Sequence, residues 1–229
     1  MGRALRIGNP PIEVDLRRSA RARRLSLRVS RLDGKVTLTM PPRAPERQAL
    51  DFLTEREDWL RGHLDDIRPA VTAGPGVALP YMGRDIMVRV ADVRRVTVND
   101  GALLLPPGAG APAIRAYLKA RARDRLASAS DHYAGLIGRN YTKLTLRDTR
   151  SRWGSCTSTG GLMYSWRLIM APPAVLDYVA AHEVAHLEQM NHSDAFWAIV
   201  ARLDPDYAAH RRWLREHGDR LHAVRFDAG

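Results

Sequence analysis

The sequence of 229 residues contains a single cysteine, Cys156. One thiol cannot form an intrachain disulfide, so nothing indicates a small secreted scaffold held together by disulfide bonds. The first residues lack the apolar segment of a signal peptide, and no run approaches the ~18 apolar residues of a membrane-spanning helix. We therefore expect a cytoplasmic protein that has no contact with a membrane.

Lysine is nearly absent, since only Lys35, Lys119 and Lys143 among the 36 basic residues are lysines and the others are arginines. The formal net charge is +11, and residues 1–31 carry nine arginines against Glu13 and Asp15. Codon usage in a GC-rich genome is one explanation of this bias. The other is an anionic partner such as nucleic acid, because guanidinium groups bind phosphate in a bidentate manner.

Hydrophobic residues make up 45% of the chain, which is enough for a buried core. Alternating apolar and polar residues predict strands, and apolar residues at helical spacing predict helices. Asp33-Gly34 predicts a hairpin between the first two strands. No internal repeat is visible. The predicted strands are 25–30, 35–40, 77–90, 93–98, 102–105, 143–147 and two within 150–168, and the predicted helices are 45–66, 112–137, 173–190, 194–203 and 206–217.

The segment 106–110, Pro-Pro-Gly-Ala-Gly, has the composition of a linker. We place a domain boundary there, between a strand-rich region with one helix at 1–105 and a second domain at 106–229. The order of the elements predicts an α+β protein, in which helices of the second domain pack beside a small antiparallel sheet.

Residues 182–186 read His-Glu-Val-Ala-His, the strongest chemical signal in the chain. Histidines four residues apart on an α-helix differ by about 40° around its axis, so both imidazoles can reach one ion. Glu183 lies beside them and is placed to accept a proton from a water that the metal activates. This pattern predicts a zinc hydrolase in which His182 and His186 bind the metal and Glu183 is the general base.

A catalytic zinc takes three protein ligands and keeps one position open. His192, six residues after His186, can be the third ligand only if the helix ends before it. Asn191 is a residue that tolerates the left-handed conformation of a helix terminator, and Asn191 or Ser193 can cap a following helix. The metzincin spacing is the same, but Gln189 stands where metzincins have glycine, which argues against that family.

Other residues near this motif have more than one interpretation. A strand at Arg152 and Gly154 would let an extended substrate pair with its edge, although Trp153 and Arg152 also suit a core and a surface position. Tyr164, Tyr207, His210 and Arg152 are the candidates for stabilising the transition state. We expect Cys156 to be a buried small residue and Trp197 to lie under the site. Histidines 63, 132, 217 and 222 are expected at the surface.

Several segments together resemble the YgjP-like metallopeptidase-domain family, predicted metal-dependent hydrolases related to the SprT and WLM zincins. They are 24–29 and 34–38 near the start, then 152–157, 166–173, 177–187, 190–193 and 196–197. The resemblance implies a zincin-like catalytic half, zinc at His182, His186 and His192, and catalysis by Glu183. Family members often have Asn before the Trp-Arg pair, where this chain has Ser165, so a role of that Asn in the cleft does not carry over.

These observations predict a zinc metallopeptidase that acts on a peptide or protein substrate. Two alternative functions would explain the excess of arginine. In one, the chain is a metal-dependent nucleotide pyrophosphatase, although three imidazoles suit zinc better than magnesium and no phosphate-binding glycine loop is present. In the other, arginines bind DNA or RNA and the zincin half cleaves bound proteins, by analogy with SprT relatives.

Overall fold

The computed structural model describes residues 3–30, 34–65 and 70–226. The chain forms two compact units, Met1–Ala70 and Val71–Gly229. Helices and small sheets occur in both, which confirms the predicted α+β class. Among the described helices, none combines the length and the apolar character that crossing a lipid bilayer requires.

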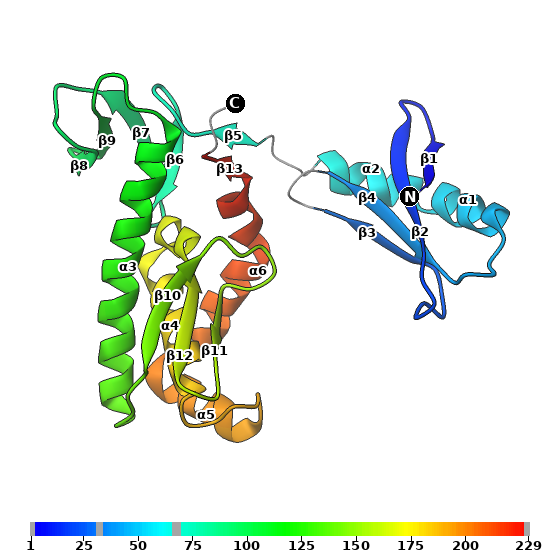
Figure 1. The fold of residues 1–229 in the computed structure, drawn as a ribbon. Helices are drawn as coiled ribbons and strands as arrows, with labels where there is room; N and C mark the ends of the chain where they lie inside the picture. Colours follow the sequence, from blue (N-terminus) through cyan, green and yellow to red (C-terminus); the bar gives the residue numbers. More distant parts are fainter. Residues whose placement is uncertain (1–2, 31–33, 66–69, 227–229) are drawn as a thin grey trace. The chain divides into compact units, whose positions relative to one another are not determined.

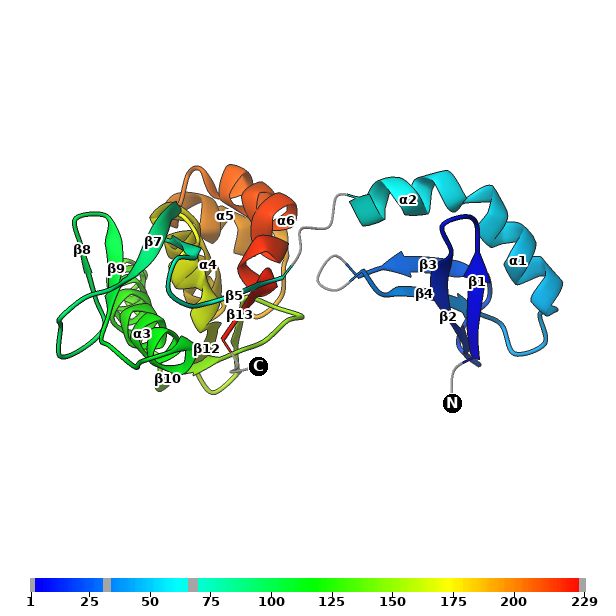
Figure 2. The ribbon, with the colours of Figure 1, turned by 90° about the horizontal axis from the view of Figure 1, so that it is seen from above.

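The first unit is a four-stranded sheet in the order β1-β2-β4-β3, with two helices against it (Figure 2). Buried residues alternate along β2 and β4, as expected of a sheet with one covered face. The antiparallel pairing of β3 with β4 confirms the predicted hairpin, although Asp33 of its turn lies outside the described residues. The elements are β1 (Arg3–Ile7), β2 (Ile12–Arg18), β3 (Ser26–Val29), β4 (Val36–Met40), α1 (Glu46–Glu55) and α2 (Glu57–Asp65).

The single helix predicted at 45–66 is wrong in one respect, because it is interrupted at Arg56. The backbone of Arg56 leaves the helical region, with φ −109° and ψ 9°. The break lets Leu53 of α1 and Leu60 of α2 both enter the core of the first unit. Strands β1 and β2 were not predicted, although apolar and polar residues alternate along β2 as they do along the strands that were predicted.

The second unit begins with another four-stranded sheet, in the order β6-β7-β9-β8. A long helix, α3, follows it and runs beside β10 (Figure 1). The elements up to this point are β5 (Val71–Thr72), β6 (Ala78–Tyr81), β7 (Arg84–Val90), β8 (Thr97–Asn99), β9 (Ala102–Leu105), α3 (Ala111–Leu136) and β10 (Lys143–Arg147).

The sheet β6–β9 shares its core with the predicted catalytic half. Leu79, Leu103 and Leu105 belong to one apolar cluster with Ile114 of α3. The turn between β6 and β7 also reaches the segment before the metal motif, since the amide of Met82 donates to the carbonyl of Ile169 at 2.9 Å. The units therefore divide between Ala70 and Val71, and the predicted boundary at 105/106 instead cuts through a continuous core.

The remaining elements surround α4, which carries the His-Glu-x-x-His motif. The sheet β10-β12-β11 is mixed, because β10 pairs with β12 in parallel and only β11 pairs with it antiparallel. Helices α3, α5 and α6, strand β11 and the 3-10 helix η1 all contact α4. These elements are β11 (Gly154–Cys156), β12 (Gly161–Ser165), η1 (Trp166–Met170), α4 (Pro173–Ala185), α5 (Asp194–Leu203), α6 (Tyr207–Ala223) and β13 (Val224–Arg225).

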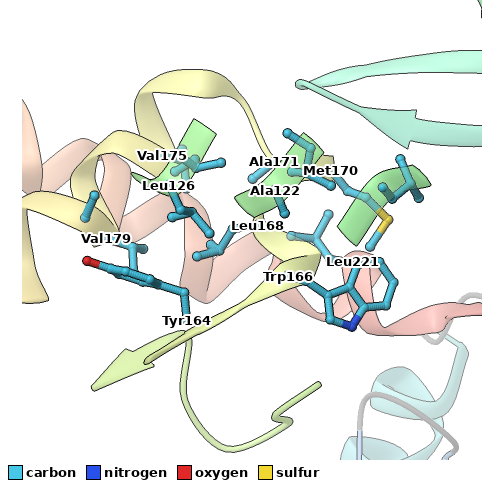
Figure 3. Packing of buried hydrophobic residues seen from close by; sticks show 14 of the residues in the cluster. Ala122, Leu126, Tyr164, Trp166, Leu168, Met170, Ala171, Val175, Val179 and Leu221 are labelled. Carbon is cyan, nitrogen blue, oxygen red and sulfur yellow. The ribbon is translucent and has the colours of Figure 1, made fainter. Parts of the chain in front are cut away.

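The core around α4 is built from several elements at once. Val175 and Val179 of α4 meet Leu126 of α3 and Leu168 of η1, and Tyr164 of β12 lies among them (Figure 3). All five side chains are at most 3% exposed. Burying an aliphatic or aromatic side chain of this size contributes about 1.5–3 kcal/mol. The part of α4 that precedes the motif is therefore packed into the core, which fixes the position of the helix.

Candidate metal centre

The histidine motif lies where α4 ends. The helix closes with Ala185, and His186 is its C-cap residue with φ −66° and ψ −17°. The predicted continuation to Met190 is wrong, because short turns replace the helix: the amides of Leu187 and Glu188 donate to carbonyls three residues back. One bond of helical spacing remains, from the amide of Gln189 to the carbonyl of Ala185 at 3.0 Å, and the chain then leaves the helical path before His192.

His192 follows in the connection between α4 and α5. Asn191 does not have the left-handed conformation that we predicted for a terminator, since Met82 and Asp100 are the non-glycine residues with positive φ in the described chain. Instead its side-chain oxygen accepts a hydrogen bond from the amide of Ser193 at 3.2 Å. Ser193 is the N-cap residue of α5 by position, without a side-chain cap bond. This turn brings His192 back toward α4.

Potential ligand atoms of His182, His186 and His192 all lie within 4.8 Å of one another. The Nε2 atoms of His182 and His192 are 3.2 Å apart. Two nitrogens bound to one zinc at about 2.0–2.1 Å with a tetrahedral angle would be about 3.3 Å apart. The donor set and its spacing therefore fit a divalent cation held by three imidazoles.

Phe196 of α5 is a platform beneath the three imidazoles. Its side chain is fully buried and stacks on the ring of His186 at a centroid distance of 4.4 Å. The rings of His182 and His192 meet it edge-on, at 4.9 and 4.8 Å. Trp197 lies beside His182 at 5.7 Å, as expected of a residue under the site. Apolar spacing predicted α5, but no sequence signal assigned this role to Phe196.

Hydrogen bonding and burial keep the imidazoles of His182 and His186 in the form that binds metals. The Nδ1 atom of His186 is 3.0 Å from the carbonyl oxygen of Gln189, so its Nε2 atom is free to bind an ion. Burial, together with the other two imidazoles, lowers the pKa of His182 to about 3. Burial also lowers the pKa of His186. Both side chains are therefore neutral near pH 7, as metal ligation requires.

Glu183 is 6% exposed and lies against β11. Burial raises the pKa of its carboxyl to about 8, and the charge of Arg152 acts in the opposite direction. A carboxyl whose pKa lies near the working pH can both accept and release a proton. The strand leaves room for it only because residue 154 is glycine: a Cβ at Gly154 would lie 2.5 Å from Oε1 of Glu183.

A groove of about 440 Å³ opens over the three histidines and Glu183. Its other wall is formed by Arg152, Gly154, Ser155 and Cys156, from β11 and the residues before it. Strand β11 is the last strand of its sheet, so its outer edge is unpaired in the described chain. Backbone donors and acceptors at such an edge can pair with an extended peptide.

Cys156 is half-buried in this groove, and it is not among the three grouped residues whose ligand atoms could hold a metal. Burial, and then the neighbouring Glu183, raise the pKa of its thiol to about 11. A thiol with so high a pKa is a poor nucleophile near neutral pH. Cys156 packs against the core as a partly buried residue that also lines the groove, not as the buried small residue that was predicted.

The other predicted substrate contacts lie away from the groove. Tyr164 is fully buried among core side chains (Figure 3), and its hydroxyl is 3.0 Å from the hydroxyl of Ser130. The assignment of Tyr164 to the transition state is therefore wrong, because core packing closes it off. Tyr207 stacks on Trp197 at 5.4 Å. His210 is half-buried and bonded through Nδ1 to Asp204 at 2.8 Å. Neither Tyr207 nor His210 lines the groove.

Comparison with known protein families matches residues 23–217 to one family, described as YgjP-like, metallopeptidase domain. No curated protein matches the chain, and no solved structure does. The match begins in the first unit and extends through α4 and α5 into α6, so it includes the histidine cluster and the residues around it. The chain belongs to the YgjP-like metallopeptidase-domain family.

Proposed function

We propose that the protein is a zinc metallopeptidase in which His182, His186 and His192 bind the metal and Glu183 is the general base. The convergence of three imidazoles beside a buried carboxyl is the observation that carries this proposal. Three nitrogen ligands favour zinc over magnesium or calcium, which prefer oxygen. Zinc supplies Lewis acidity, which polarises the scissile carbonyl and lowers the pKa of water.

The residues of the chain account for the remaining steps. The unpaired edge of β11 holds the substrate backbone in an extended conformation over the histidines. Glu183 accepts a proton from the attacking water as the new carbon–oxygen bond forms. It then passes that proton to the amine nitrogen as the peptide bond breaks. The pKa of Glu183 suits both transfers, since burial favours the protonated form and a bound cation favours the ionised one.

Two substitutions separate metal binding from catalysis. We expect Glu183→Gln to keep its zinc and to hydrolyse an unfolded protein about 10²–10⁴-fold more slowly, the usual contribution of a general base. The matched control is Glu188→Gln, the same chemical change at an exposed position five residues later, which should leave the rate unchanged. Full activity in Glu183→Gln would remove the carboxylate from the mechanism.

Metal content is measured directly by elemental analysis. His186→Ala should lose the bound zinc, whereas His132→Ala, at an exposed position of α3, should retain it. Equal zinc content in the two variants would show that the ion is bound elsewhere.

The partners of the protein are likewise proposals: a peptide or protein substrate in the groove, and nucleic acid at the first unit. In that unit Arg17, Arg21, Arg23 and Arg28 are exposed. If they bind DNA or RNA, the affinity must fall steeply as salt increases. A nucleotide pyrophosphatase is tested in the same activity screen by including nucleoside triphosphates beside the unfolded protein.

A further inference from the structure

A second cavity, of about 300 Å³, shares His182, Glu183, Arg152 and Gly154 with the metal groove but extends toward α6. We call it the arginine pocket because Arg152, Arg211 and Arg215 all border it. Among the described residues, Glu183 is the one acidic residue that lines it. Three positive charges therefore face a cavity in direct continuity with the proposed reaction centre.

The arginines come from two elements that face each other across the cavity. Arg211 and Arg215 are one turn apart on α6 and so project from the same face of the helix. Arg152 lies just before β11, and its charge acts on the Glu183 carboxyl. Within the described chain, none of the three guanidinium groups has an ion pair or a hydrogen bond, although Arg211 lies over the ring of Trp197 at 4.9 Å. Their donors are thus available to a ligand.

The remaining lining is mainly apolar, and it consists of Trp153, Tyr178, Val179 and Leu214. The wall at Trp153 is held in place by α6: its ring stacks on His222 at 4.7 Å, and a Cβ at Gly218 would lie 2.8 Å from it. A ligand that fills this pocket combines a hydrocarbon part with a negatively charged end.

We propose that the arginine pocket binds a carboxylate of the peptide substrate, carried by a residue next to the bond that is cleaved. Arginine and carboxylate form strong bidentate hydrogen bonds, and the apolar walls accept the stem of the group. The carboxylate is either an acidic side chain or the free C-terminus of the substrate. This inference deepens the proposed peptidase function and rests on it.

The test measures binding without turnover, in zinc-loaded Glu183→Gln protein, by titration calorimetry. Three forms of one short peptide are compared: a neutral amidated parent, the same peptide with a free C-terminal carboxylate, and the amidated peptide with Glu in place of one Gln. We expect one acidic form to bind about tenfold more tightly than the neutral parent, and the stronger of the two identifies the source of the carboxylate. Raising the salt concentration should reduce the preference.

Substitutions test whether the arginine pocket causes the preference for an acidic peptide. Arg211→Gln and Arg215→Gln should each reduce it severalfold, and Arg215→Glu should favour a peptide with Lys at the same position. Arg212→Gln is the matched control, because Arg212 is exposed on α6 but does not line the pocket. Circular dichroism and zinc content establish that each variant is folded and loaded.

The outcomes distinguish this inference from the function on which it rests. Equal affinity for the three peptides, or a preference that survives both Arg211→Gln and Arg215→Gln, would overturn the pocket assignment. Arginine-dependent binding of inorganic pyrophosphate with no peptide preference would overturn it as well, in favour of a phosphate ligand. If the acidic peptide binds as expected but the unmutated protein hydrolyses no peptide, the pocket stands and the peptidase function fails.

Discussion

Gly154 is the residue on which the position of the Glu183 carboxylate depends. In Gly154→Ala the new Cβ would lie 2.5, 2.6 and 2.8 Å from Oε1, Cγ and Cδ of Glu183, so the carboxyl must move. The backbone at this position does not require glycine, since its φ is not positive. A misplacement of about 1 Å in a catalytic group can cost 10²-fold in rate. We expect kcat to fall about 10–100-fold while zinc content stays the same.

Gly135→Ala is the matched control, because a Cβ at Gly135 of α3 would meet nothing within 4 Å. Its kinetics should be those of the unmutated protein. If Gly154→Ala also retains the full kcat, the close approach of β11 does not position Glu183.

The sequence predicted the grouping of the three histidines better than their surroundings. Helical spacing alone predicts that His182 and His186 share one face, and the need for a helix break before His192 follows from the same geometry. The contact of Gly154 with Glu183 joins two elements far apart in the sequence, and the stacking of Phe196 on His186 depends on how two consecutive helices pack. Local patterns carry no signal for such contacts, because they depend on how elements pack.

At the scale of elements, η1 and the residues before β11 contact the end of α6 through hydrogen bonds and ring stacking. Arg167 of η1 is 9% exposed. Its guanidinium donates to the carbonyls of Leu221 and Val224 at 2.7 and 2.9 Å and pairs with Asp148 at 2.6 Å. These bonds satisfy carbonyl groups that a helix end leaves without partners. Trp153 stacks on His222 of the same turn, so one wall of the arginine pocket depends on this junction.

His222 makes this junction sensitive to acid. Burial, and then the charge of Arg167, lower its pKa from 6.5 to about 4. Between these values the unfolded chain binds the proton and the folded one does not, so the free energy of unfolding falls as the pH falls through this window. We expect about 1–2 kcal/mol to be lost between pH 7 and pH 4.5, after allowing for partial solvation.

The measurement is urea denaturation of metal-free protein at both pH values, followed by circular dichroism. His222→Phe keeps an aromatic ring against Trp153 but cannot be protonated, so its loss of stability between the two pH values should be smaller by that amount. An identical loss in both proteins would mean that other groups cause the acid sensitivity. A surface position was predicted for His222, because the sequence around His222 does not show that the ring of Trp153 covers it.

The prediction of helices and strands has the same limit, because local patterns do not show how elements pack. Strong periodicity placed α3, α5 and β10 to within a few residues. Helix α4 ends earlier than its apolar pattern suggests, because the turns at 187–190 direct His192 toward the metal site. The parallel pairing of β10 with β12 was not predicted, since periodicity identifies a strand but not its partner.

At the scale of the whole molecule, the two units begin with the same arrangement of strands. The orders β1-β2-β4-β3 and β6-β7-β9-β8 correspond strand by strand, and both combine two antiparallel outer pairs with a parallel central pair. A Pro-Pro pair and a helix follow in each, at 41–46 and at 106–111. The sequence shows no repeat, because the likeness lies in the topology and not in the side chains.

The sheet β6–β9 is an integral part of the unit that contains the histidine cluster, and the sheet β1–β4 belongs to the other unit. The two apolar clusters have no residue in common, and the cluster around α4 begins at Ala73. Strand β5 also pairs with β13, near the end of the second unit. A chain of residues 71–229 therefore retains every buried contact of its own core.

We expect residues 71–229 alone to fold, to melt cooperatively and to bind zinc in the same proportion as the full chain. Residues 106–229, which start at the boundary suggested by the linker, should not fold. That shorter chain lacks Leu79, Val88, Leu103 and Leu105, each at most 1% exposed, and each such loss costs about 1.5–3 kcal/mol. Circular dichroism and elemental analysis of the two fragments decide between the boundaries. Cooperative melting and bound zinc in residues 106–229 would mean that the sheet β6–β9 contributes little to the metal-binding core.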